Sequence, residues 1–214
     1  MLFVIAVFVF LISLAFHEFA HALTAYKMGD ITPKATGRLT INPFKHVTFG
    51  GVLFFIFFGF GWAKPVPINP LNFKKYKTGT RLVSIAGILA NIILGLVAAV
   101  INAILLATVG VGSVAMHYVY VLLDMFMLVN SVLAIFNLLP IYPLDGFTFI
   151  TTFMKGENKF IRNSVKNGIY IMLGILIADT LLELFFNIHI LSMVLTLLYN
   201  YVFIPISLLG VLLW

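Results

Sequence analysis

Five long segments of the chain carry few or no charged residues, and they restrict what the chain can fold into. They are residues 1–26, 82–109, 117–139, 168–187 and 190–213. As a helix, each is long enough to cross the roughly 30 Å hydrocarbon core of a bilayer. Lipid offers the backbone no hydrogen-bond partners, so a segment that crosses it must satisfy its own N–H and C=O groups. The sequence therefore predicts an all-α polytopic membrane protein with about five transmembrane helices.

The composition supports a membrane-embedded chain and limits its partners. Hydrophobic residues make up 62% of the 214 residues and charged residues only 9%, whereas about a quarter of the residues of a soluble protein are charged. The net charge of +6 does not indicate a nucleic-acid partner, because loop lysines in a membrane protein set its topology. We find no internal repeat and no appended soluble domain, which predicts one integral-membrane domain over residues 1–214.

The region between the first two apolar segments has a different pattern. Residues 31–47 lack helical periodicity, and Pro33 and Pro43 bracket a short strand-like stretch at residues 36–42. Residues 48–62 are apolar but only 15 residues long, with glycine near both ends. This length is short for a span and is typical of a re-entrant or interfacial segment.

The basic residues predict the orientation of the spans. Nine of the thirteen Lys and Arg residues lie within residues 27–81, and the other four lie within 155–166. If residues 48–62 do not cross the membrane, both basic clusters lie on one side, which should be the cytoplasm. The prediction is a multi-pass protein of the cell membrane whose N-terminus is outside, with polar loops at residues 63–81 and 155–167 in the cytoplasm.

One turn of the first apolar segment contains three residues that are costly in lipid, His17, Glu18 and His21. Positions i and i+4 lie on the same face of a helix, so both imidazoles project together and can bind one Zn²⁺. The glutamate beside the first histidine is then placed to act as a base. The chain has no cysteine, so any further metal ligand must be His, Asp, Glu, Asn or water.

A third metal ligand must lie at the depth of the two histidines. The first and third spans should run in the same direction, with the histidines toward the cytoplasmic end of the first. Asp145 follows the third span at that end, after a break with two prolines that frees the chain to turn inward. The other acidic residues that we considered lie nearer the outside: Asp124, Asp179 and Glu183. We therefore predict that Asp145 and the two histidines bind one zinc ion per chain.

The remaining polar residues give weaker signals. Intramembrane amides such as Asn91 and Asn130 are expected to form hydrogen bonds between helices. Asn137 has a stronger case for a functional role, because it lies eight residues before Asp145 at the edge of the break. His46 is expected to be an ordinary loop histidine, with contact to the site or to a substrate as the alternative.

Five motifs occur in a fixed order over residues 13–146. They are F-H-E-F-A-H-A-L-T-A-Y-K-M-G-D, G-R-L-T-I-N-P, A-K-P-V-P-I-N-P, S-I-A-G-I-L-A-N and F-N-L-L-P-I-Y-P-L-D-G. Together they resemble the site-2 protease family of intramembrane zinc metalloproteases, and most closely its compact prokaryotic branch without a PDZ or nucleotide-sensing domain. The chain departs from that family at Ile88, Thr48 and Phe147, where a proline, an acidic residue and a glycine are usual.

The resemblance implies roles for particular residues. The zinc ligands of the family correspond to His17, His21 and Asp145, its general base to Glu18, and its motif asparagine to Asn137, which could donate to an oxyanion. The implied activity is zinc-dependent hydrolysis of peptide bonds in or near transmembrane segments of membrane-anchored proteins, at a site that opens toward the cytoplasm. The substrate helix must unwind before it is cut, and the strand-like stretch at residues 36–42 could receive it by strand addition.

The expected organisation is one peptidase domain with a catalytic core at about residues 1–155 and accessory helices at about 166–214. The family's membrane-associated β-hairpin corresponds to residues 31–47. Two other classes of protein stay open. A metal-ion or proton transporter would also place His, Glu and Asp in its spans, although two related halves would be usual. A catalytically inactive membrane-binding relative would be expected to lack Glu18 or a ligand, and all are present.

Overall fold

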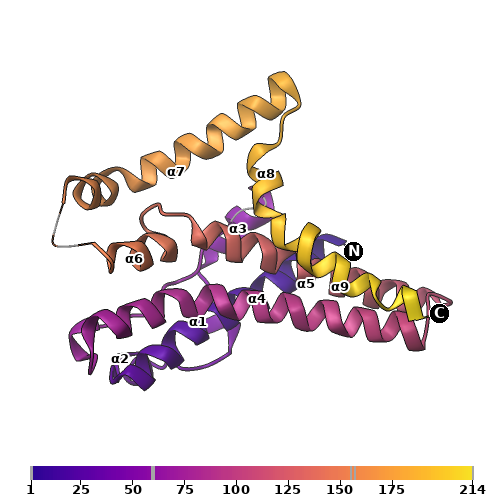
Figure 1. The fold of residues 1–214 in the computed structure, drawn as a ribbon, viewed down its shortest axis with the longest axis horizontal. Coiled ribbons are helices and arrows are strands. Elements are labelled where there is room, and N and C mark those ends of the chain that lie inside the picture. The colour runs from indigo at the N-terminus through magenta and orange to yellow at the C-terminus, as the bar shows by residue number, and fades with distance from the viewer. Residues whose placement is uncertain (1, 59–60, 155, 157, 214) are drawn as a thin grey trace.

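The structure, a computed structural model, describes residues 2–58, 61–154, 156 and 158–213, and most of these residues are helical (Figure 1). The α-helices are α1 (Leu2–Met28), α2 (Thr32–Ala35), α3 (Phe49–Phe58), α4 (Tyr76–Thr108), α5 (Val114–Leu138), α6 (Asp145–Thr151), α7 (Lys159–Phe186), α8 (Ile190–Leu195) and α9 (Ile204–Leu208). Shorter helical turns are η1 (Pro43–Lys45), η2 (Pro70–Asn72), η3 (Tyr199–Phe203, a π-helix) and η4 (Val211–Leu213). The prediction of an all-α protein is confirmed for the described residues.

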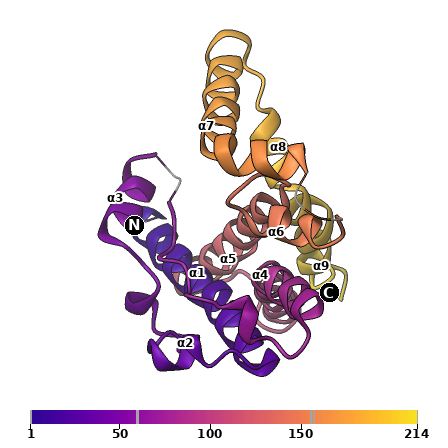
Figure 2. The same cartoon turned by 90° about the vertical axis from the view of Figure 1, so that its left-hand side faces the viewer.

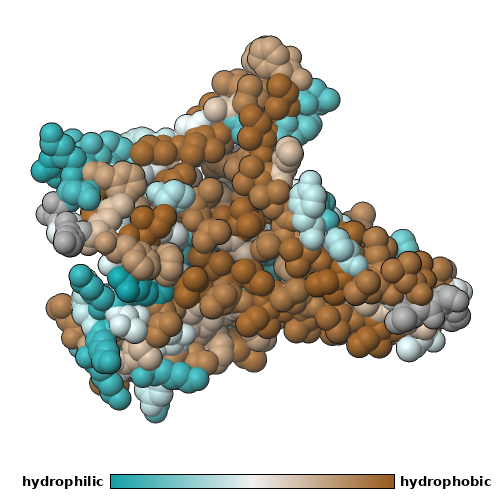
Figure 3. All heavy atoms as spheres, viewed as in Figure 1, coloured by the Kyte–Doolittle hydropathy of each residue, from teal (hydrophilic) through white to brown (hydrophobic). Residues whose placement is uncertain are grey.

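Four of the described helices are long and apolar enough to cross a membrane, judged by length and composition: α1, α4, α5 and α7. The first three form a bundle in which α1 and α5 run in the same direction and α4 runs against them (Figures 1 and 2). Helix α7 stands apart from this bundle, and the most apolar part of it has no buried residue. Figure 3 shows hydrophobic residues over most of the visible surface, a surface that lipid can cover.

The prediction of a fifth continuous span at residues 190–213 is wrong. The structure divides this segment into α8, η3, α9 and η4. Pro205 lies within it and has no N–H to donate to the preceding turn. The hydroxyl of Ser131 on α5 donates to the carbonyl oxygen of Leu195 at 3.0 Å and accepts from the N–H of Tyr199 at 3.0 Å. These two bonds satisfy backbone groups that the interrupted helix leaves free.

The expected β-hairpin at residues 31–47 is also wrong. The described part of this segment contains α2 and η1, and no strand occurs in the described residues of the chain; a single isolated bridge joins Val47 and Ala63. Pro33 lies in the first turn of α2, where a missing N–H has no cost. The N–H of Arg38 donates back to the carbonyl oxygen of Pro33 at 2.8 Å. Local turns therefore take the backbone hydrogen bonds that a hairpin would have needed.

The segment at residues 48–62 contains the ten-residue helix α3, and its residues 59 and 60 lie outside the described part of the chain. The two ends of this segment lie side by side, because the N–H of Lys64 donates to the carbonyl oxygen of His46 at 2.7 Å. The ring of Phe55 stacks on Phe10 of α1 with centroids 4.0 Å apart. The stacking contact places α3 beside α1. Packing of a ten-residue helix against α1 is no evidence that the segment enters the membrane, so the re-entrant segment predicted from the sequence is not supported.

The hydrophobic core of the bundle consists of two clusters, with a polar region between them. One buried cluster joins α4, α5 and the C-terminal turns: Ala98, Ala99, Leu123, Met127 and Phe203. A second cluster contains Ala25, Phe73 and Val83, at the other end of α4. Along α4, Gly87 and Asn91 lie between the two clusters, at the level of the histidines of α1. Helices α1, α4 and α5 therefore enclose the polar residues in the middle of the bundle.

Candidate metal centre

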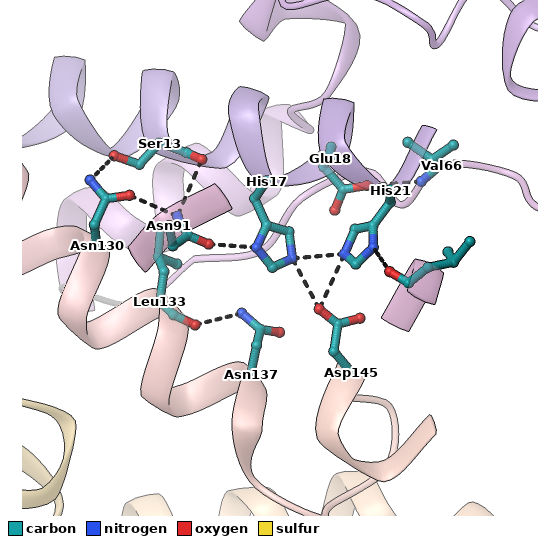
Figure 4. A network of polar contacts seen from close by, with 11 residues as sticks. Ser13, His17, Glu18, His21, Val66, Asn91, Asn130, Leu133, Asn137 and Asp145 are labelled. Atoms are coloured by element: carbon teal, nitrogen blue, oxygen red, sulfur yellow. Dashed lines mark hydrogen bonds and ion pairs between the residues drawn. The ribbon is translucent and has the colours of Figure 1, made fainter. Parts of the chain in front are cut away.

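The two histidines of the HExxH motif lie on one face of α1 and point toward each other (Figure 4). Their Nε2 atoms are 3.0 Å apart, and His17 and His21 are 5% and 7% exposed. Both face α4 and the start of α6 rather than the outside of the bundle. The helical spacing predicted from the sequence therefore brings both rings to one point.

The break between α5 and α6 carries Asp145 to the two histidines. Its Oδ2 lies 3.2 Å from His17 Nε2 and 3.1 Å from His21 Nε2. Residues 139–144 contain no helix, and Asp145 is the first residue of α6. Gly146 permits this turn, because a Cβ there would lie 2.5 Å from the carbonyl carbon of Leu138.

The three other acidic residues named from the sequence lie away from this point. Asp124 accepts from the hydroxyl of Tyr199 at 2.7 Å, and Asp179 accepts from the N–H of Leu191 at 2.8 Å. Glu183 lies 3.6 Å from the ring of His189, near the end of α7. The structure therefore brings together the three residues that were proposed as ligands and does not bring these acids to them.

Hydrogen bonds at the Nδ1 atoms define the tautomers of both histidines. His21 Nδ1 lies 2.7 Å from the carbonyl oxygen of Val83, which can only accept, so Nδ1 carries the proton. His17 Nδ1 lies 2.6 Å from Oδ1 of Asn91 and donates to it in the same way. In the neutral rings, both Nε2 atoms then have a free lone pair directed at Asp145.

A chain of amides on α4 and α5 determines which atom of Asn91 faces His17 (Figure 4). Nδ2 of Asn130 donates to the carbonyl oxygen of Phe126 at 2.8 Å and to the hydroxyl of Ser13 at 2.9 Å. Its Oδ1 therefore faces Asn91, whose Nδ2 donates to it at 2.8 Å. The Oδ1 atom of Asn91 therefore faces His17. The carbonyl of Phe126 on α5 orients Asn130, Asn130 orients Asn91, and Asn91 determines the tautomer of His17.

The three converging atoms match the donor set of zinc. Their separations of 3.0, 3.1 and 3.2 Å are close to the roughly 3.3–3.4 Å between ligand atoms that zinc bonds of about 2.0–2.1 Å give in a tetrahedron. Oδ2 of Asp145 is buried and accepts no hydrogen bond from the residues that the structure describes. Two lone pairs and a carboxylate oxygen that face one another at this distance are stabilised by a cation, so the residues fit a divalent metal ion.

Gly87 on α4 lets the helix approach the two imidazoles. A Cβ at this position would lie 2.5 Å from Cε1 and 2.6 Å from Nε2 of His17. Gly87 and Asn91 are four residues apart, so they share a face of α4 that packs on the histidines. A side chain at position 87 would displace the rings, and the glycine is therefore part of the centre.

Glu18 and Asn137 lie at the same cavity as the proposed ligands. The cavity has a volume of about 300 Å³ and is lined by residues of α1, α4, α5, α6 and the segment before α4: His17, Glu18, His21, Pro65, Val66, Ile68, Pro70, Phe73, Thr80, Val83, Ser84, Asn137, Pro143, Asp145 and Thr148. Oε2 of Glu18 accepts from the N–H of Val66 at 3.0 Å. Nδ2 of Asn137 donates to the carbonyl oxygen of Leu133 at 2.9 Å, which leaves its second N–H for another acceptor.

The structure also tests what the sequence predicted for His46 and for the intramembrane amides. His46 is fully buried, donates from Nε2 to the carbonyl oxygen of Thr40 at 2.7 Å, and does not line the cavity. Burial lowers the pKa of His46 more than its contact with Thr40 raises it. Asn91 and Asn130 form the expected bonds between helices, but the sequence did not reveal that these bonds reach a histidine. The spacing of Gly87 and Asn91 on one helix face was the available signal.

The fold defines a protein with membrane-length helices, and its HExxH motif lies among residues that could hold a metal ion; comparison with known proteins agrees. Residues 43–179 match the model of peptidase family M50, and the chain belongs to this family. The resemblance to the site-2 proteases is thereby confirmed. No solved structure matches the chain.

Known relatives share much of the sequence. The chain is 42% identical over 144 residues to the putative zinc metalloprotease YwhC of Bacillus subtilis, covering 65% of this chain and 64% of that protein. It is 29% identical over 193 residues to the putative zinc metalloprotease Rip2 of Mycobacterium tuberculosis, covering 87% and 71%. The Rip2 protein of Mycolicibacterium smegmatis is 29% identical over 192 residues, covering 86% and 71%. The alignment with the Bacillus protein thus spans less than two thirds of its length.

The acceptor at His17 leads to a prediction. Asn91→Leu should lower the affinity for zinc about 10- to 100-fold, because His17 loses the acceptor that holds its ring and tautomer. Competition with a chelator of known affinity would measure this on the purified protein. Asn102→Leu is the matched control, since Asn102 is also buried in α4 but lies 11 residues further along. Equal affinities in the two variants would contradict the role of Asn91.

Proposed function

We propose that the protein is an intramembrane zinc metalloprotease that hydrolyses peptide bonds in or near transmembrane segments of membrane-anchored proteins. The observation that carries this proposal is the convergence of His17, His21 and Asp145 within 4.8 Å of one another, beside Glu18 in a cavity between membrane-length helices. Membership of peptidase family M50 supports it, as do the names of the relatives.

In this proposal the centre holds one zinc ion through Nε2 of His17, Nε2 of His21 and a carboxylate oxygen of Asp145. A bound zinc polarises the scissile carbonyl and makes water more acidic. The residues around the ligands hold their lone pairs in place. Asn91 and the carbonyl of Val83 accept from Nδ1 of the two rings, so in the neutral rings the Nε2 lone pairs face the position of the metal.

Two further residues carry the chemistry of peptide hydrolysis. Glu18 takes a proton from the attacking water and delivers it to the nitrogen of the leaving amine, so that water adds across the peptide bond. The free N–H of Asn137 donates to the oxygen of the scissile carbonyl as negative charge develops there. Both side chains line the cavity, so a peptide that enters it meets the base and the donor together.

The cavity also limits how a substrate is presented. The apolar part of its lining, which includes Val66, Ile68 and Phe73, suits apolar side chains of a peptide. A volume of about 300 Å³ is too small for an intact helix with side chains, about 10–12 Å wide. A substrate helix therefore unwinds before its bond is cut. Strand addition at residues 36–42 is not part of this proposal, because those residues form no strand.

We place the cavity on the cytoplasmic side of a cell membrane and the N-terminus outside. The basic residues within 27–81 and 155–166 support this orientation. In Figure 3, hydrophilic surface gathers toward the end of the molecule where α4 and α7 begin. Thr80 and Ser84, in the first turns of α4, line the cavity. The opening therefore lies near the basic end of the bundle.

The test is cleavage of a model single-span protein by the purified enzyme in lipid vesicles. A strong chelator should abolish cleavage and zinc should restore it, because the ligands and the base do not suffice without the ion. Mass spectrometry of the products should place the cut in the half of the substrate span nearer the cytoplasm. Cleavage that continues after complete metal removal would refute the proposal. Metal or proton flux without any peptide product would favour a transporter instead.

A further inference from the structure

A short segment with no regular secondary structure crosses the cavity between α3 and α4. We call residues 64–69 the strap. Two of its six residues are Pro65 and Pro67, which restrict the backbone and have no N–H. Pro65, Val66 and Ile68 line the cavity. The strap is therefore a preformed wall of the site with few N–H groups of its own.

The middle of the strap contacts the proposed base. Val66 N–H donates to Oε2 of Glu18 at 3.0 Å, and Val66 is 8% exposed (Figure 4). This bond ties one oxygen of the carboxylate to the strap. A glutamate side chain has three rotatable bonds, so an N–H at a fixed place selects one orientation of its carboxylate.

Two buried charged side chains hold the ends of the strap. Arg38 is 6% exposed and donates from Nη2 to the carbonyl oxygens of Lys64 and Pro65. At the other end, Oδ2 of the fully buried Asp30 accepts from the N–H of Asn69 at 2.7 Å. Val66 lies between these two attachments, so they determine where its N–H points.

The hydrogen bonds around Asp30 stabilise its carboxylate in the charged form. Its Oδ1 accepts from the hydroxyl of Thr32 at 2.6 Å, the N–H of Thr32 at 3.1 Å and Nδ2 of Asn72 at 2.8 Å. Burial alone would raise the pKa of Asp30, but these bonds and the bond from Asn69 outweigh it and hold the pKa below its usual value. The charged carboxylate therefore joins the end of α1 to the strap and to η2.

We infer that the strap positions Glu18 for catalysis through the N–H of Val66, and that Asp30 and Arg38 are positioning residues that hold the strap. This inference rests on the proposed protease function. The strap acts on the base and not on the metal ligands, so its loss should reduce turnover and leave zinc binding intact.

The direct test compares Val66→Pro with Val66→Ala. Both remove the valine side chain, but only proline also removes the N–H that Glu18 accepts. We expect kcat of Val66→Pro to be about 10- to 100-fold below that of Val66→Ala, the loss expected for a misplaced catalytic group. KM, zinc content and Tm should be similar in the pair. Equal kcat values, or loss of zinc in the proline variant alone, would overturn the inference.

A second pair of variants tests the contact between Asp30 and Asn69 at the end of the strap. It also covers the case in which Val66→Pro does not fold. Asp30→Ala should lower kcat with zinc retained, because Asn69 is released. Asp179→Ala is the matched control, since Asp179 also accepts a backbone N–H, from Leu191, but lies outside the strap. An Asp30→Ala enzyme with the turnover of the control would overturn the inference. If the wild-type protein itself did not cleave, the proposed function would fail, a result distinct from the failure of the strap.

Discussion

The Glu18→Gln protein is expected to keep its zinc and to lose cleavage by about 10²–10⁴-fold, the contribution of a general base. Glutamine has nearly the shape of glutamate, and its amide oxygen can still accept from the N–H of Val66. The substitution therefore preserves the wall of the cavity and removes only the ability to take a proton. A carboxylate with a purely structural role would instead tolerate neutralisation in a buried site, with activity kept.

The measurement pairs zinc content with cleavage of a single-span substrate in the same preparation. Glu183→Gln is the matched control, because it makes the same substitution on α7, at a glutamate whose side chain is 57% exposed. The control should cut at the wild-type rate. Glu18→Gln protein that retains zinc and still cuts near the wild-type rate would show that the mechanism proposed for Glu18 is wrong.

Asp145→Ala should remove most of the bound zinc, the largest effect on metal binding that we expect from a single substitution. The variant leaves only the two Nε2 atoms of His17 and His21 at the centre, without the anionic oxygen that lies 3.1 and 3.2 Å from them. The loss of affinity should exceed the roughly 10- to 100-fold expected for a residue that only orients a ligand. Cleavage should fall with zinc occupancy.

Metal analysis after dialysis against a weak chelator would measure this loss. Asp124→Ala is the matched control. Asp124 lies in the membrane-length helix α5, and its carboxylate accepts from the hydroxyl of Tyr199 instead of facing the two histidines. The control should keep about one zinc per chain. Full occupancy in Asp145→Ala would remove this residue from the ligand set, and loss of zinc in the control would assign a metal ligand to α5.

Local pattern, together with the distribution of basic residues, was enough for the class of protein and for the choice of candidate residues. The length of the apolar segments predicted the helices α1, α4, α5 and α7, which the structure contains. The i, i+4 spacing of His17 and His21 predicted two rings on one face of α1. The proline-containing break predicted that Asp145 could turn toward them. Helical periodicity and proline chemistry are local, whereas the choice of Asp145 among the acidic residues also needed the direction of the spans, which the basic residues predicted.

Where local pattern was misleading, contacts with distant segments or local turns decided the outcome. Residues 190–213 are apolar enough for a span, but they divide into short helical pieces, and Ser131 of α5 satisfies backbone groups at the interruption. Residues 31–47 lack helical periodicity, but their turns use the backbone hydrogen bonds that a hairpin would need. Hydrophobicity alone distinguishes neither case.

The sequence by itself determined which residues could bind a metal ion, and only the tertiary structure decided how they are held. The acceptor at His17 Nδ1 is 74 residues away in the chain, the acceptor at His21 Nδ1 is 62 residues away, and the donor to Glu18 is 48 residues away. No periodicity within a helix specifies such pairs. They form because α4 packs on α1 with a glycine at the contact, and because Asp30 and Arg38 hold the strap across the cavity.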